Sequence, residues 1–177
     1  MFDEELYKRV DEAVRKMLES EWEVGFNLWR RCLLNIQILV EDTIPYDIRY
    51  GGIPFLYEAG FLSGKRIGEE LMDRFNLHEK SMKERAYFMD SFVKNAGVGE
   101  PSFITLLEGK KGIRFPGGTY LAREYGKRAG HTICTNTAGF IAGATDAITG
   151  RHWFVREVKC VAAGDDCCEF LVEEKKE

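Results

Sequence analysis

Length, composition and charge exclude several classes of protein at the outset. The chain has 177 residues, of which 45% are hydrophobic, so it can bury a core without disulfides. Its net charge of −4 disfavours direct nucleic-acid binding. Residues 1–5 are too acidic for a signal peptide, and no apolar run reaches the roughly 18 residues of a membrane span. We therefore expect a cytoplasmic protein with no membrane partner.

The N-terminal segment has the periodicity of helices. Apolar residues recur at helical spacing over Leu6–Leu18 and, after a predicted break near Gly25, over Trp29–Val40. Cys32 lies in the second stripe and is expected in the core. Residues 1–50 are thus predicted to form an N-terminal helical segment whose stripes face either the core or a second subunit.

Glycine and proline interrupt the chain after this segment. Pro45 and residues 51–54 are predicted to separate it from a third helix over Leu56–Phe75. Gly60 and Gly64 lie within the apolar stripe of this helix, and such small residues predict close packing against another helix.

The rest of the chain mixes helical and strand patterns. In order, the predicted elements are a helix over Met82–Ala96, a hairpin of Phe103–Leu107 and Gly112–Phe115, a short helical or irregular stretch through Leu121 to Ala129, a slim helix over Asn136–Ile148, and a final hairpin of Trp153–Ala162 and Cys168–Val172.

Three cysteines have spacings that favour a metal site. Cys160 and Cys168 flank a turn-like stretch, and a hairpin centred on Gly164 would place their sulfurs opposite each other. Cys134 precedes the slim helix, where exposed amides favour a thiolate. With Glu157 the set would form a closed, structural zinc site. The alternative is a group of buried apolar cysteines, and without a CxxC pair the spacing does not decide between the two.

The fourth ligand is less certain from the pattern. Glu157 and Cys160 are three apart and would face opposite sides of a regular strand, so Glu157 requires a strand irregularity. His131 is the alternative fourth ligand. Cys167 is expected on the face opposite to Cys168, in a structural role.

A small-molecule pocket is predicted beside the slim helix, which permits either close packing or a cavity. The three histidines are scattered in polar contexts and give no catalytic arrangement, so an enzymatic role is not favoured. The residues predicted to contact a ligand are Phe103, Phe115, Ala138, Phe140, Trp153 and Val155.

The second half resembles the vinyl-reductase domain family, which is named after a bacteriochlorophyll-pathway protein and also supplies the sensory module of aromatic-responsive bacterial activators. The residues that carry the resemblance are Cys134, the small residues of 138–143, and the ending 157–170. It is firmest over residues 117–172 and slight before residue 50.

The resemblance implies an α+β fold, a single domain with helices packed on a twisted antiparallel sheet, similar to TRAPP trafficking subunits. It also implies a zinc ion held by Cys134, Glu157, Cys160 and Cys168, which ties the C-terminal hairpin, and a homodimer. Residues 51–177 would form the small-molecule-binding domain, with a pocket beside the zinc-bearing segment.

The chain departs from the activators of this family in two respects. The histidine and tryptophan that bind phenol in aromatic sensors have no counterpart within residues 85–115, so phenol itself is not expected. The chain also lacks the ATPase and helix-turn-helix domains of an activator. A signal would therefore pass to a separate effector protein.

We expect a stand-alone, regulatory sensor that binds an apolar or aromatic ligand. One alternative is a tetrapyrrole-related reductase or its accessory subunit, as the family name suggests. The other is a ligand-free adaptor resembling trafficking subunits, which would have a filled core.

Overall fold

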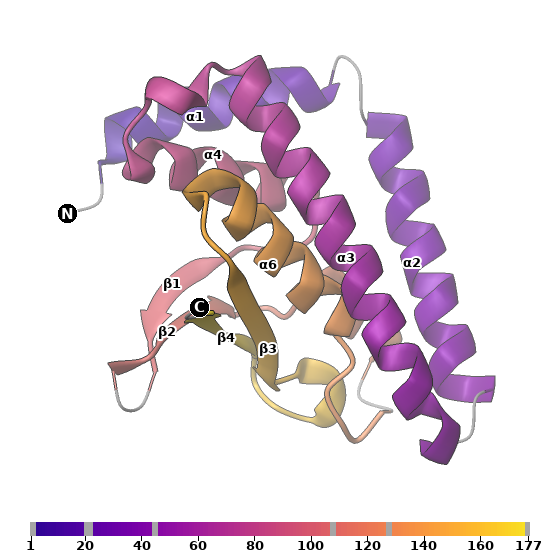
Figure 1. Cartoon of the computed structure of the whole chain (residues 1–177). Coiled ribbons are helices and arrows are strands. Elements are labelled where there is room, and N and C mark those ends of the chain that lie inside the picture. Colours follow the sequence, from indigo (N-terminus) through magenta and orange to yellow (C-terminus); the bar gives the residue numbers. More distant parts are fainter. Residues whose placement is uncertain (1–2, 20–22, 44–45, 107–108, 127–128, 176–177) are drawn as a thin grey trace.

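The computed structural model describes residues 3–19, 23–43, 46–106, 109–126 and 129–175, and the side chains of residues 23–28, 42–43 and 46–53 lie outside this description. Helices and strands alternate as shown in Figure 1. The elements are α1 (Glu4–Met17), α2 (Glu23–Thr43), α3 (Tyr46–Arg74), the 3-10 helix η2 (Leu77–Glu79), α4 (Met82–Asn95), β1 (Ser102–Thr105), β2 (Lys111–Phe115), α5 (Tyr120–Tyr125), α6 (Thr135–Thr149), β3 (Trp153–Lys159), the 3-10 helix η4 (Val161–Ala163) and β4 (Cys168–Glu174).

The strands form one antiparallel sheet in the order β1-β2-β4-β3. Helix α6 packs on β3 and also against α3, while α1 packs on α4 and α2 contacts α5 (Figure 1). The α+β class and the two predicted hairpins are confirmed. Among the described helices, none is both long and apolar enough to span a membrane.

Two predicted interruptions in the first half are wrong. Gly25 lies inside α2, and the break between the first two helices falls between Met17 and Glu23 instead. Residues 51–54 do not separate helices, because α3 begins at Tyr46 and continues through Pro54. Glycine and proline disfavour a helix locally, but packing of the whole element usually decides whether it forms.

The stripe of α1 belongs to the core, since Val10, Val14 and Met17 are buried in the main hydrophobic cluster. The stripe of α2 does not follow the prediction, because Cys32 is exposed. Helix α2 instead buries Gln37 and Glu41, which hydrogen-bond each other at 3.0 Å. The division of the chain at residue 50 stays a prediction.

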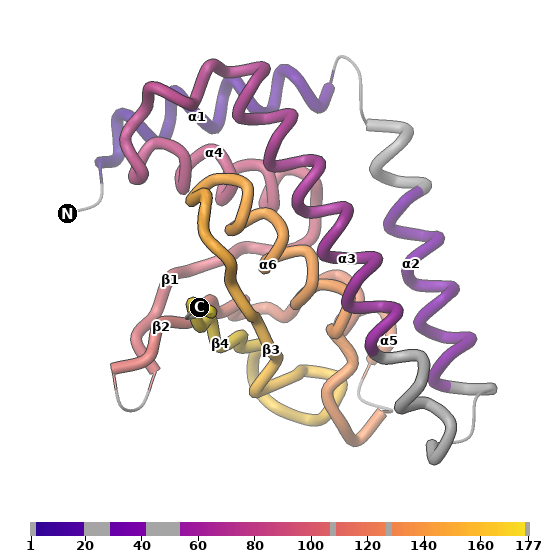
Figure 2. The backbone as a smooth tube through the Cα atoms, viewed as in Figure 1, coloured from indigo at the N-terminus to yellow at the C-terminus, as the bar shows by residue number. Residues whose placement is uncertain are grey.

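Helices α3 and α6 approach each other backbone to backbone, as the tube in Figure 2 shows. A methyl group added at Gly64 would overlap the carbonyl oxygen of Phe140, and one at Gly143 would overlap that of Phe61. The same conflict arises at Gly60 and Gly139. The close packing predicted from the small residues is therefore confirmed, and only glycine fits these positions without a shift.

We predict that Gly64→Ala lowers the free energy of unfolding by about 3 kcal/mol, because overpacking forces the two helices apart and outweighs the better helix propensity of alanine. Urea unfolding of the variant measures this change. Gly117→Ala is the control, since a methyl group there meets no atom within 4 Å. Equal stabilities for the two variants would contradict the close contact.

Candidate metal centre and ligand cavity

Four side chains converge where α6, β3 and β4 meet. Cys134 immediately precedes α6, Glu157 lies in β3, Cys160 follows β3, and Cys168 begins β4. One potential ligand atom from each lies within 4.8 Å of the others. All three cysteines are fully buried. The structure therefore brings together the four residues that the sequence singled out, as a cluster that could hold a metal ion.

A strand irregularity turns Glu157 toward the cysteines. Glu157 pairs with Phe170, but Lys159 pairs with the adjacent Glu169, so the register shifts by one residue between them. This bulge was required by the spacing and is confirmed. It explains how residues three apart in sequence reach the same cluster.

The turn between β3 and β4 is fixed by hydrogen bonds around Cys160. Its backbone N–H donates to Asp165 Oδ2 at 2.8 Å, and the N–H of Val161 donates to Cys168 Sγ at 3.5 Å. Gly164 has a φ of +109°, a left-handed conformation that favours glycine. These contacts hold both sulfurs of the hairpin on the side of Cys134.

The donor set fits tetrahedral coordination. Zinc–sulfur bonds of about 2.3 Å separate the sulfurs of a tetrahedral site by about 3.8 Å, and Cys134 Sγ lies 3.9 Å from Cys160 Sγ. Glu157 Oε2 accepts a hydrogen bond from the Cys134 backbone at 2.8 Å, but its buried Oε1 has no hydrogen-bond partner. A cation would satisfy this orphaned oxygen.

Burial shapes the electrostatics of the cluster. It raises the pKa of the Cys134 thiol well above its ordinary value and raises the pKa of Glu157 to about 8. The pKa of Cys168 is lowered, because Cys134 and Cys160 donate hydrogen bonds to its sulfur. A divalent cation would favour the deprotonated form of every member, so metal binding and proton release would be coupled.

The two other candidates lie outside the cluster. His131 Nε2 is 2.9 Å from Glu41 Oε2 of α2, so this histidine links the loop before α6 to α2. Cys167 Sγ lies 3.7 Å from Glu169 Oε1. The same carboxylate accepts a hydrogen bond from Arg114 Nε at 2.7 Å. Cys167 thus belongs to a separate polar group.

A cavity of about 320 Å³ lies between α4, α6 and the sheet. Four of the residues predicted to contact a ligand line it, namely Phe103, Phe115, Phe140 and Trp153, whereas Ala138 and Val155 are buried elsewhere. The further lining residues are Met82, Ala86, Met89, Asp90, Val93, Pro101, Lys111, Gly112, Ile113, Ile141, Ala144, Thr145, Ile148, Thr149 and Val172.

Sequence reasoning missed the wall that α4 contributes. The stripe through Met82, Ala86, Met89 and Val93 was correctly predicted as one helical face. Periodicity marks a face that avoids water, but it does not distinguish a face packed against side chains from one that borders a cavity.

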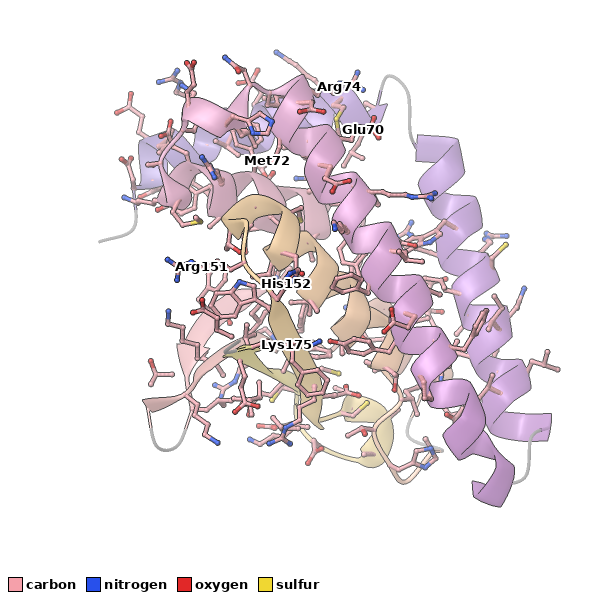
Figure 3. All side chains as sticks on the ribbon, in the orientation of Figure 1. Glu70, Met72, Arg74, Arg151, His152 and Lys175 are labelled. Carbon is pink, nitrogen blue, oxygen red and sulfur yellow. The ribbon has the colours of Figure 1, made fainter. Side chains whose placement is uncertain are left out.

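Trp153 is held in the cavity wall by the end of α6. Its indole Nε1 donates to Thr149 Oγ1 at 2.8 Å, and its backbone N–H donates to Asp146 Oδ1 at 2.8 Å. His152 Nδ1 lies 3.0 Å from the other oxygen of Asp146, and Figure 3 shows His152 beside the end of this helix. One helix therefore carries Cys134 at its start, the cavity wall along its length and the Trp153 contact at its end.

Comparison with known proteins agrees with this geometry. Residues 121–174 match the family model of the vinyl-4-reductase (4VR) domain. This segment is a vinyl-reductase domain. The resemblance to that family is thereby confirmed. An uncharacterised protein from Methanocaldococcus jannaschii is 51% identical over 41 residues, which are 23% of this chain and 23% of that protein.

Solved structures share the fold that surrounds the vinyl-reductase segment. The phenol-responsive sensory domain of the transcription activator PoxR, solved with phenol, has a TM-score of 0.60 and 20% identity, over 82% of this chain and 74% of that one. A vinyl-4-reductase family protein from Methanocaldococcus jannaschii has a TM-score of 0.55 and 20% identity, over 99% and 98%. A trafficking protein particle complex subunit 3 from Naegleria fowleri, covalently bound to palmitic acid, has a TM-score of 0.61 and 18% identity, over 87% and 97%.

We predict that a chelator lowers the free energy of unfolding of the wild type by about 3–4 kcal/mol, the linkage expected when a metal is present at roughly 100 to 1,000 times its dissociation constant. Chemical unfolding with and without chelator measures the difference. Cys160→Ser should lose this sensitivity, because it removes one ligand.

Cys167→Ser is the matched control, since it changes the neighbouring thiol in the same hairpin and should keep the full chelator effect. An identical response of the two variants would contradict a metal site at the cluster.

Proposed function

We propose that this chain is a zinc-stabilised sensory domain that binds an apolar or aromatic small molecule and acts on a separate effector protein. The observation that carries the proposal is the position of α6, which borders the cavity and begins at the Cys/Glu cluster. A cytoplasmic location and the absence of direct nucleic-acid binding stay predictions.

The cavity supports the binding of a small molecule. Its volume of about 320 Å³ lies within the range of small-molecule sites, and most of its lining side chains are apolar or aromatic. Two proteins of the same fold are described with such molecules, PoxR with phenol and the trafficking subunit with palmitic acid. These neighbours favour an apolar body in the ligand and do not give its identity.

Zinc is the ion that the donor set favours, because three thiolates and one carboxylate form a closed site of the structural kind. Cys134, Glu157, Cys160 and Cys168 would hold it. Bound there, it would cross-link the start of α6 to the β3–β4 hairpin and thereby contribute to folding.

The mechanism we propose is a shift of α6 on ligand binding. The ligand would bury apolar surface against Phe140, Ile141 and Ala144, which lie on α6. Because the glycine contacts join α6 closely to α3, the two helices would move together. Cys134 would transmit the same shift to the terminal hairpin and so alter a surface that an effector contacts.

The cavity bears on the alternatives. A ligand-free adaptor would have a filled core, so a cavity of about 320 Å³ argues against that hypothesis. The tetrapyrrole-related reductase, or its accessory subunit, stays a prediction.

We predict that 1-ethylnaphthalene, an apolar aromatic probe, slows amide hydrogen exchange in α6, because a filled cavity suppresses local opening of its wall. Exchange measured by mass spectrometry would report this protection. Ala86→Phe should abolish it, since Ala86 lines the cavity and the larger ring occupies the probe's volume.

Lys83→Phe places the same ring on an exposed position of the same helix and should leave the protection intact. Unchanged exchange of wild-type α6 at saturating probe would contradict the proposed mechanism.

A homodimer is also proposed, with its contact on α2 and α3. Ile36 and Leu39 of α2 and Phe55 and Leu62 of α3 are exposed, and Phe55 retains 72% of its accessible surface. Exposed apolar side chains that gather on neighbouring helices favour a protein contact.

We predict that Leu39→Glu raises the dimer dissociation constant by about tenfold or more, because a buried charge without a partner is costly. Sedimentation equilibrium measures this constant. Asn35→Glu introduces the same charge at an exposed polar position of α2 and should change it far less. A monomeric wild type would contradict the dimer itself.

A further inference from the structure

We infer that Asp90 is the polar anchor of the cavity and that the ligand is an apolar or aromatic molecule carrying a protonated amine. The inference rests on the proposed function, because it specifies the ligand of the same cavity. It comes from an inventory of the polar side chains in the lining, which are Asp90, Lys111, Thr145 and Thr149.

The neutral polar groups of the wall have already used their protons. Thr145 Oγ1 donates to the carbonyl of Ile141 at 2.7 Å, and Thr149 Oγ1 donates to the carbonyl of Thr145 at 2.7 Å. The indole N–H of Trp153 donates to Thr149 Oγ1. These side chains can therefore offer a ligand acceptors rather than donors.

Asp90 is the half-buried charge of this lining. It lies on the face of α4 that also carries Ala86 and Val93, four residues before it and three after it, and all three line the cavity. The hydroxyl of Tyr7 donates to Asp90 Oδ2 at 2.6 Å. This bond from α1 orients the carboxylate, whose two oxygens retain further acceptor capacity toward the cavity.

The surroundings of Asp90 favour a cationic partner. Burial disfavours the ionised carboxylate and raises its pKa, and the negative charge of Asp11 acts in the same direction. A cation bound at Asp90 would offset both effects. Lys94 and Lys111 are solvent-exposed, so their attraction for an anionic ligand would be screened by water.

The ligand that fits has an apolar body against the aromatic and aliphatic walls and an ammonium group at Asp90. A carboxylate at the same end would face the charge of Asp90 in a partly desolvated site. Hydrogen bonds between charged groups are stronger than those between neutral ones, so the end group should decide among molecules that share one body.

The test compares four probes that share a naphthalene body: 2-(1-naphthyl)ethylamine, 2-(1-naphthyl)ethanol, 3-(1-naphthyl)propanoate and the hydrocarbon 1-ethylnaphthalene. Titration calorimetry on the full chain measures their dissociation constants. We expect the wild type to bind the amine about 10- to 100-fold more tightly than the propanoate, with the alcohol between them.

Asp90→Asn removes the charge but keeps an oxygen that can accept the Tyr7 hydroxyl, and it should reduce the amine preference to within about threefold. Lys111→Gln removes the other lining charge and should leave that preference intact. Thermal unfolding without probe checks that Asp90→Asn is folded, and the wild-type series tests the inference even if it is not.

The outcomes separate the inference from the proposed function. Binding of the hydrocarbon and the amine with equal affinity, or an amine preference that survives Asp90→Asn, would overturn the anchor and leave an apolar ligand site. Failure of all four probes to bind the wild type would overturn both.

Discussion

The architecture depends on the close contact between α3 and α6. Gly60 and Gly64 on one helix and Gly139 and Gly143 on the other let the backbones meet where no side chain fits. Helix α6 is thereby fixed on one side, and its remaining surface serves the sheet, the cavity and the Cys/Glu cluster. A small-residue contact of this kind makes α6 a rigid element whose position both the ligand and the metal would affect.

The C-terminal part of this structure could be predicted because chemistry and local geometry point the same way. Cys134, Cys160 and Cys168 meet as expected, and the bulge that Glu157 required is present. The N-terminal part could not be predicted in the same way. The apolar stripe around Cys32 suggests a core face, but α2 turns Gln37 and Glu41 inward, because Glu41 is paired with His131 from a distant loop. A long-range polar pair of this kind leaves no periodic signal in the sequence.

The cavity illustrates a second limit of sequence reasoning. The aromatic wall was predicted from Phe103, Phe115, Phe140 and Trp153, but the stripe of α4 was read only as a helix face. Asp90 interrupts that stripe, and its role becomes visible only once Tyr7 and the empty volume beside it are in place. One site thus combines an apolar body pocket with a single half-buried charge, while the metal cluster lies at the start of the helix they share.

Native mass spectrometry of the wild type, purified without chelator or added metal, tests the central claim most directly. The account predicts one zinc ion per chain together with a co-purified small molecule, which would begin to identify the ligand. Metal-free protein with five free thiols and no bound small molecule would contradict both the metal centre and the sensory role.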